Sequence, residues 1–133
     1  MKKRILVIDD EEILTKTLAR LLERQNYEVL VASRPEEACM MTKGKDFDLI
    51  LCDIRMPEKN GVETIREIRS LTKSKSKGET PVIFLTGFAD VKLEKEAQTL
   101  NPIAYIFKPF DTLKLLEVIE STLCVTSKPK ENG

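Results

Sequence analysis

The 133-residue chain contains no histidine, and this absence excludes acid–base catalysis by an imidazole and an internal phosphohistidine. Its three cysteines, Cys39, Cys52 and Cys124, lack the CxxC-type spacing of metal sites. Each lies among apolar neighbours, so we expect buried, reduced thiols in a cytoplasmic protein. No apolar run approaches the length of about 18 residues that a membrane span needs, and no signal peptide precedes the first apolar run. We therefore expect no membrane partner.

An excess of charge is also missing, because 22 Lys and Arg residues balance 22 Asp and Glu residues. Dedicated nucleic-acid-binding domains usually carry a basic excess, so we expect no direct binding of nucleic acid. The charged fraction of 33% and the hydrophobic fraction of 41% are ordinary for a soluble domain. We expect one domain over residues 1–126, followed at residues 127–133 by a tail or the start of a linker.

Short apolar runs alternate with amphipathic segments five times along the chain. The apolar runs predict strands over residues 5–8, 27–32, 49–52, 81–85 and 103–107. A helical face of apolar residues follows the first strand (Ile13, Leu14, Leu18, Leu21, Leu22) and the last (Leu113, Leu116, Ile119, Leu123). Five such units predict a three-layer α/β sandwich, in which helices cover both faces of a parallel sheet.

Polar residues indicate where helices and loops begin. Ser33 and Glu36 have the spacing of a capping box, and Asp90 and Asp111 precede the fourth and fifth helices. The stretch TKSKSKG at residues 72–78 predicts a mobile, solvated loop.

A carboxylate ends the third apolar run. Residues 47–61 read FDLILCDIRMPEKNG, and the run before Asp53 suits a strand that is buried on both faces. A carboxylate is costly to bury alone, although an aspartate at a strand end is more often a turn residue than a functional group. This feature by itself does not establish a function.

Other strands also end in polar residues. The first strand ends at Asp9 and Asp10, the fourth at Thr86 and the fifth at Lys108, while the second offers only Ser33. Each has an ordinary explanation as a turn or a helix-terminal charge. In a parallel sheet, however, all of these groups emerge at one edge, where ligands bind. The contributing strands would lie side by side if the strand order is 2-1-3-4-5, so the coincidence indicates a site.

Carboxylates that converge in one pocket must bind a cation or take up protons. At a separation of about 4 Å and an effective dielectric of about 20, each pair repels by about 4 kcal/mol. Oxygen ligands without histidine or cysteine favour Mg²⁺ (or Mn²⁺). A carboxylate can also attack phosphorus, and phosphoryl transfer needs mainly positioning and charge neutralisation. We therefore predict that Asp53 accepts a phosphoryl group and that Asp9 and Asp10 hold the metal. Lys108 and Thr86 would contact phosphate oxygens.

The motifs that carry these residues resemble those of the response-regulator receiver domains of two-component signalling. They read VIDDE at 7–11, DLILCDIRMP at 48–57, NG at 60–61, FLTG at 84–87 and FKPF at 107–110. The resemblance implies a flavodoxin-like (βα)₅ fold and a signalling domain rather than an enzyme, with self-phosphorylation and autodephosphorylation chemistry of its own. It also implies that Asp53 receives its phosphoryl group from the phosphohistidine of a sensor kinase or a phosphotransfer protein.

The resemblance assigns further roles residue by residue. Asp10 and Asp53 would ligate Mg²⁺ directly, and Asp9 would do so directly or through a water. Arg55 would add its backbone carbonyl oxygen. The peptide bond between Lys108 and Pro109 would be cis.

Tyr105 matches the position of the family's switch aromatic. In that role Tyr105 turns inward when Thr86 moves toward the phosphate, because a group of charge about −2 biases a two-state element. The surface formed by the fourth helix, the fifth strand and the fifth helix would then change, and a homodimer through that face is an arrangement that the resemblance allows. The alternative explanation of Tyr105 is simple packing on an edge strand.

Two positions depart from the family pattern. Pro102 lies where many receivers have a glycine-containing turn, which puts the shape of the output face in question. Phe88 is bulky where many relatives have a smaller residue, and we expect it to shield the acyl phosphate from water.

Two other functions compete with a phosphorylation switch. A pseudo-receiver would act without phosphorylation, but the intact set of acidic, hydroxyl and lysine residues speaks against it. A phosphatase of the haloacid-dehalogenase type would carry DxD after its first strand, where this chain has Asp9-Asp10-Glu11.

Overall fold

The computed structural model describes residues 2–73 and 78–127. Its strands are β1 (Arg4–Ile8), β2 (Glu28–Ala32), β3 (Leu49–Asp53), β4 (Val82–Thr86) and β5 (Ala104–Phe107), and they form one parallel sheet in the order β2-β1-β3-β4-β5. Its helices are α1 (Glu12–Arg24), α2 (Pro35–Gly44), α3 (Gly61–Leu71), α4 (Val91–Gln98) and α5 (Thr112–Ser127). The predicted three-layer fold and the predicted strand order are both confirmed.

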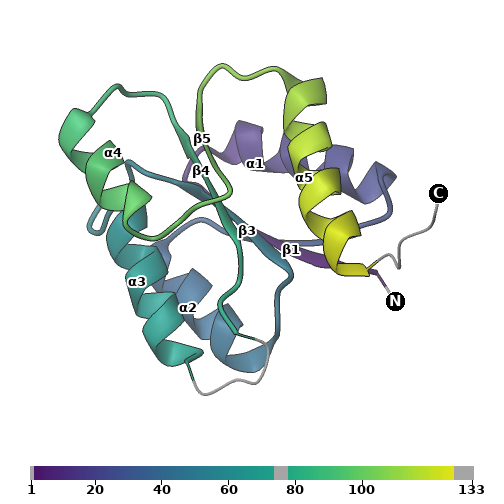
Figure 1. The fold of residues 1–133 in the computed structure, drawn as a ribbon, viewed down its shortest axis with the longest axis horizontal. Helices are drawn as coiled ribbons and strands as arrows, with labels where there is room; N and C mark the ends of the chain where they lie inside the picture. The colour runs from purple at the N-terminus through teal and green to yellow at the C-terminus, as the bar shows by residue number, and fades with distance from the viewer. Residues whose placement is uncertain (1, 74–77, 128–133) are drawn as a thin grey trace.

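The helices divide between the two faces of the sheet, with α1 and α5 on one face and α2, α3 and α4 on the other (Figure 1). Alternate residues of each central strand enter the two cores, since side chains of a strand alternate in direction. In β1, Ile5 and Val7 pack toward α1 and α5, whereas Leu6 and Ile8 pack toward α2 and α3. Both cores bury β3 and β4 completely, which explains their uninterrupted apolar sequences.

The prediction that two apolar residues belong to the buried faces of their helices is wrong. Ile13 is 83% exposed and Leu113 is 71% exposed. Each lies in the first turn of its helix, off the stripe with four-residue spacing that packs against the sheet. In α5 that stripe consists of Leu115, Ile119 and Leu123, so the sequence prediction missed Leu115.

The predicted helix caps were partly correct. Asp90 accepts a hydrogen bond from the Leu93 amide at 3.0 Å, and Asp111 accepts one from the Leu113 amide at 3.0 Å. The capping box of Ser33 with Glu36 is wrong, because α2 begins at Pro35 behind Arg34. The Ser33 amide and hydroxyl instead donate to the carboxylate one residue further on, in Glu37, at 2.8 and 3.1 Å.

The remaining local expectations have mixed outcomes. The thiols of Cys39 and Cys52 are free and buried as expected, whereas the free thiol of Cys124 is only half-buried. Residues 74–77 of the predicted loop and residues 128–133 of the predicted tail lie outside the described residues. Within the described ranges, no helix combines the length and the hydrophobicity of a membrane span.

The turn before β5 replaces the glycine-containing turn of many receivers with Asn101-Pro102. Asn101 has φ 53°, a left-handed conformation that asparagine adopts more readily than most residues. Arg69 of α3 fixes the same turn, because its Nη1 donates to the Leu100 carbonyl at 2.6 Å. The turn is therefore tied to α3.

Gly61 is the first residue of α3 and lies close in space to Asp53, the last residue of β3. A Cβ atom at this position would lie 2.3 Å from the backbone carbonyl oxygen of Asp53, a distance at which the backbone must shift. The Gly61 amide also donates to the Ile54 carbonyl at 2.8 Å. The close approach of α3 to β3 therefore requires glycine.

Gly61→Ala is expected to lower the free energy of unfolding by about 1–3 kcal/mol, the usual cost of forcing an extra methyl group into packed structure. Urea unfolding followed by circular dichroism measures this change. Gly44→Ala is the matched control, because a Cβ at Gly44 meets nothing within 4 Å. Equal stability of the two variants would contradict the close approach.

Candidate functional site

The polar residues predicted from the strand ends do meet at the carboxyl edge of the sheet. Asp9 and Asp10 follow β1, Asp53 ends β3, Thr86 ends β4 and Lys108 follows β5. The four strands are neighbours in the sheet, and the Lys108 amide donates to the Thr86 carbonyl at 2.7 Å. Strand order and register therefore create the site, although the residues are far apart in the sequence.

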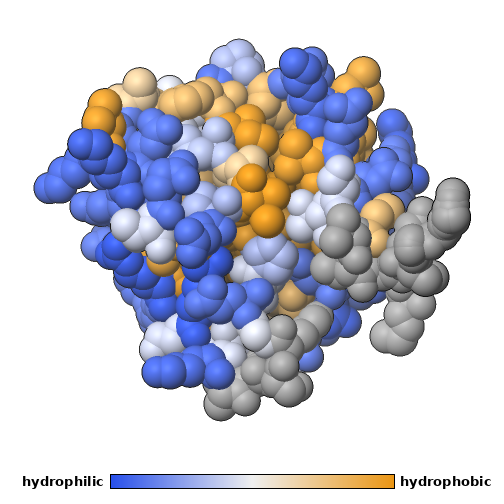
Figure 2. All heavy atoms as spheres, viewed as in Figure 1, coloured by the Kyte–Doolittle hydropathy of each residue, from blue (hydrophilic) through white to orange (hydrophobic). Residues whose placement is uncertain are grey.

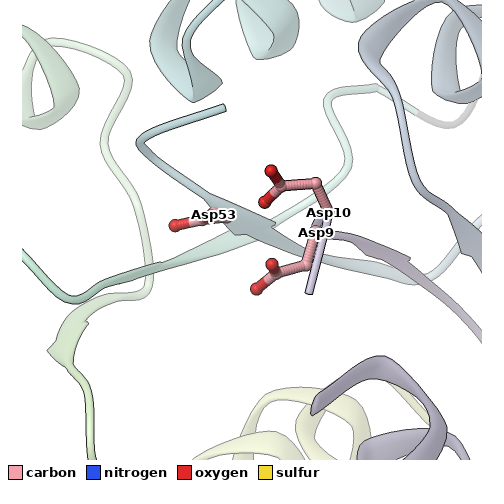
Figure 3. A group of neighbouring side chains, drawn as sticks. All are labelled: Asp9, Asp10 and Asp53. Carbon is pink, nitrogen blue, oxygen red and sulfur yellow. The ribbon is translucent and has the colours of Figure 1, made fainter. Parts of the chain in front are cut away.

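Three carboxylates form its acidic cluster, which we define as Asp9, Asp10 and Asp53. One oxygen from each lies within 4.8 Å of the other two. Figure 3 shows the three side chains at the adjacent ends of β1 and β3. Asp9 is 1% exposed and Asp53 is 4% exposed, whereas Asp10 is exposed. Two carboxylates are thus largely withdrawn from water beside a third.

Lys108 supplies the compensating charge. Its Nζ lies 2.9 Å from Asp9 Oδ2 and 3.7 Å from Asp53 Oδ1. It also lies 2.7 Å from Oε1 of Glu11, a contact that the sequence did not predict. Glu11 belongs to the VIDDE motif, but a carboxylate in this place is equally suited to the positive end of α1, so its side-chain direction could not be foreseen.

Burial is the main cause of the altered acidity of the cluster. It raises the pKa of Asp53, and with the nearby charge of Asp9 it brings that pKa to about 7, against the opposing effects of Lys108 and the Arg55 backbone. Burial also raises the pKa of Asp9. For Lys108, burial acts to lower the pKa, but the contacts with Glu11 and Asp9 outweigh it and the pKa is raised. Asp9 and Asp53 therefore hold protons more tightly than free aspartates do.

The donor set fits the predicted magnesium ion. Its ligand atoms are carboxylate oxygens, and hard divalent cations prefer such oxygens. Three carboxylates lie beside the single ammonium of Lys108, and burial and Asp9 raise the pKa of Asp53 despite that ammonium, so a cation would be favourable there. Asp9, Asp10 and Asp53 could hold the ion together.

The Thr86 hydroxyl is engaged within its own loop. Its Oγ1 accepts a hydrogen bond from the Phe88 amide at 3.1 Å and lies 3.3 Å from the Phe88 carbonyl oxygen. Above this loop, the Arg55 guanidinium carbon lies 4.3 Å from the centre of the Phe88 ring, a cation–π geometry. The β3–α3 and β4–α4 loops are therefore joined across the mouth of the site.

Tyr105 lies on β5, which β4 separates from the strand that ends in Asp53. Its ring packs 6.3 Å from that of Phe84 and 5.6 Å from that of Phe107, between centroids. Its hydroxyl oxygen is buried and has no hydrogen-bond partner among the described residues. Packing on an edge strand, the alternative explanation, accounts for the rings but leaves the hydroxyl unsatisfied.

An open cavity of about 730 Å³ adjoins the cluster. Asp53 and Lys108 lie at its polar end, and Leu14, Leu21 and Phe110 form an apolar wall. The peptide bond between Lys108 and Pro109, beside this cavity, is cis as predicted. The cavity reaches Asp10 and Asp53 from the side of α1.

Known proteins are similar in sequence to this chain over nearly its whole length. A family model described as the response regulator receiver domain matches residues 5–120. The chain is 34% identical over 122 residues to the transcriptional regulatory protein ZraR of Salmonella typhimurium, which covers 92% of the chain and 26% of the relative. It is 33% identical over 128 residues to the regulatory protein AtoC of Escherichia coli, covering 96% of the chain and 27% of the relative. The chain thus spans about a quarter of the length of these curated relatives.

Solved structures agree in fold. A CheY-like response regulator receiver domain protein from Methanospirillum hungatei has a TM-score of 0.86 at 28% identity, with 98% of this chain and 100% of that chain covered. A response regulator from Burkholderia pseudomallei, solved with a phosphorylated aspartic acid, a calcium ion and citrate, has a TM-score of 0.77 at 27% identity. There the match covers 99% of this chain and 76% of the other.

The pKa of Asp53 predicts a pH-dependent gain in stability from Asp53→Asn in metal-free buffer. Asp53 is ionised in the unfolded chain above its usual pKa of 3.8, but in the folded chain only above about 7. Protonated Asp53 therefore costs the folded chain nothing below a pH of 3.8. As the pH rises toward about 7, the unfolded chain ionises this group more readily than the folded chain does, and the folded chain loses stability. The variant should therefore exceed the wild type in stability by an amount that grows between about pH 4 and pH 7 and levels off above, at about 4 kcal/mol at most. Urea unfolding with a chelator measures it, and a pH-independent difference would contradict it.

Proposed function

Because the chain belongs to the response regulator receiver domain family, we propose that it is a phosphorylation-dependent signalling switch. Asp53 accepts a phosphoryl group from the phosphohistidine of a sensor kinase or a phosphotransfer protein, and the new charge alters the surface through which the domain acts. The observation that carries this proposal is the acidic cluster with Lys108 beside it at the carboxyl edge of the sheet. The Burkholderia relative, solved with a phosphorylated aspartic acid, supports it.

The transfer step requires an unprotonated carboxylate. An Asp53 oxygen forms a bond to phosphorus while the bond between phosphorus and the donor nitrogen breaks. The electron pair of the broken bond stays on the imidazole of the donor. Mg²⁺ or Mn²⁺, held by the acidic cluster and the Arg55 carbonyl, would supply positive charge that favours ionised Asp53 and neutralises phosphoryl oxygens. With a pKa of about 7, raised by burial and by Asp9, Asp53 would otherwise be substantially protonated at neutral pH.

Lys108 and Thr86 would respond to the phosphoryl group. Lys108 Nζ, now 3.7 Å from Asp53 Oδ1, is near enough to donate to a phosphoryl oxygen after a small movement. The Thr86 hydroxyl must first leave its hydrogen bond with the Phe88 amide. That movement would vacate space on the side of β4 that faces β5, and Tyr105 would turn inward to fill it. The unpartnered hydroxyl of Tyr105 favours such a change over fixed packing.

The partner surfaces proposed for this domain lie on two sides. The donor protein would approach Asp53 through the cavity, where Leu14 and Phe110 offer it apolar contact. A homodimer would form through α4, β5 and α5, where Figure 2 shows apolar residues gathered. The exposed apolar residues of these elements and the turn between them are Val91, Ile103, Phe107 and Leu113.

We further propose a cytoplasmic domain over residues 1–126 that does not itself bind nucleic acid.

A competing function is a pseudo-receiver that acts without phosphorylation, and another is a phosphatase with an aspartyl-phosphate intermediate. The first would not need a buried acidic cluster with a raised aspartate pKa, since such burial costs stability. The second, of the haloacid-dehalogenase type, would carry DxD after its first strand, where this chain has Asp9-Asp10-Glu11. The switch uses the acidic cluster, Lys108 and Thr86.

Incubation with acetyl phosphate and Mg²⁺ is expected to add the mass of one phosphoryl group to the wild-type chain and none to Asp53→Asn. Intact-protein mass spectrometry measures this difference, and a chelator should abolish the addition because the cluster then lacks its cation. Asp46→Asn, which alters an exposed aspartate outside the cluster, is the matched control and should still be labelled. Label on Asp53→Asn in equal yield would refute the proposal, and continuous release of phosphate would favour the phosphatase.

Phe88→Ala is expected to speed the loss of the phosphoryl group by about fivefold, which corresponds to a barrier lower by about 1 kcal/mol. The ring stacks with Arg55 across the mouth of the site, and its removal would admit water to the acyl phosphate. The decay of the phosphorylated chain after removal of the donor gives the rate. Phe88→Leu keeps an apolar side chain in place and should decay nearly as slowly as the wild type. An unchanged rate in Phe88→Ala would contradict shielding by Phe88.

A further inference from the structure

Lys108 has more acidic partners than phosphoryl transfer requires. Its Nζ lies 2.7 Å from Glu11, 2.9 Å from Asp9 and 3.7 Å from Asp53. The two shorter distances are hydrogen bonds, whereas the distance to the proposed phosphoacceptor is not. In the unphosphorylated chain the ammonium is therefore held by Asp9 and Glu11 and only approaches Asp53.

The two residues that hold Lys108 differ in their surroundings. Asp9 is buried, and its Oδ1 accepts a hydrogen bond from the Glu11 amide at 3.0 Å, which fixes the backbone of Glu11 beside it. The side chain of Glu11 is 61% exposed and reaches Lys108 from the solvent side. Asp53 is 6% exposed by the same measure, so it lies on the interior side of the ammonium. Glu11 and Asp53 therefore compete for Lys108, one from the exposed and the other from the buried part of the site.

We propose that Glu11 is a positioning residue that restrains Lys108 and thereby slows the phosphorylation of Asp53. This inference rests on the proposed function. As the new bond forms between Asp53 and phosphorus, charge on the phosphoryl oxygens draws Lys108 inward. That movement lengthens the contact with Glu11, whereas Asp9, which lies in the same cluster as Asp53, can remain within reach. Glu11 thus sets how readily Lys108 becomes available to the reaction.

Glu11→Gln keeps the size of the side chain and removes the charge that attracts Lys108. The variant is expected to be phosphorylated by acetyl phosphate about two- to fivefold faster than the wild type, a range set by the modest strength of exposed ion pairs. Saturating Mg²⁺ in every sample removes differences in metal affinity. Glu12→Gln is the matched control, because Glu12 carries the same charge at the next position but pairs with Lys16 at 3.2 Å.

A spectroscopic signature tests the restraint before any phosphoryl group is added. The side-chain ¹⁵N resonance of Lys108, assigned by its absence in Lys108→Arg, should shift in Glu11→Gln and stay unchanged in Glu12→Gln. A general reduction of negative charge near the site would accelerate both variants equally, and that result would overturn the proposal. An unshifted resonance, or a rate in Glu11→Gln no higher than that of the wild type, would also overturn it.

Failure of this inference can be told apart from failure of the proposed function. If the wild-type chain takes up a phosphoryl group on Asp53 and Glu11→Gln does so at the same rate, only the role of Glu11 is refuted. If the wild-type chain takes up none, the switch function is refuted, and the restraint on its rate falls with it.

Discussion

The site depends on the burial of Asp53 beside Asp9. Two carboxylates that are almost inaccessible to water lie next to an exposed third, and burial together with their mutual repulsion brings the pKa of Asp53 to about 7. The fold must offset this cost elsewhere, and it does so with β3 and β4, whose residues are all buried between two layers of helices. The repulsion at the carboxyl edge makes a bound cation favourable there. Lys108 relieves the repulsion only partly, and this leaves the cluster ready to bind.

The same edge of the sheet shows how two loops become dependent on each other. Thr86 is held by the backbone of Phe88, and the Phe88 ring is held by the guanidinium of Arg55, which follows Asp53 by two residues. A change at Asp53 can thus reach the β4–α4 loop through Arg55 and the Phe88 ring stacked on it. On the far side, Arg69 fixes the turn before β5 to α3. Any rearrangement of α4 is therefore easier at its beginning than at its end.

Strand positions and the polar residues that meet at the strand ends could be predicted from the sequence because each follows from a short-range pattern, and the strand order was expected from which strands end in such residues. Buried strands give uninterrupted apolar runs, and in a parallel sheet the residue after each run must emerge at the same edge. The errors arose where the decisive contact is tertiary. Ile13 and Leu113 are apolar and near the predicted stripes, but they lie off the side of each helix that packs against the sheet, so they remain exposed. Ser33 has a capping partner three residues away in sequence, yet the start of α2 at Pro35 brings Glu37 to it instead.

The contact between Glu11 and Lys108 could not be predicted for a different reason. A glutamate beside the start of a helix is favourable without any partner, so its local setting already explains its presence. Only the assembled sheet shows that the residue after β5 reaches across to the loop after β1, with the residues 97 positions apart in sequence. A side chain such as that of Glu11 can thus be favourable at the start of a helix and also contact a residue that is distant in the sequence. For such a residue the local sequence already offers a sufficient explanation. Only the position of its charged neighbour in the folded chain, here Lys108 beside Glu11, shows a further role.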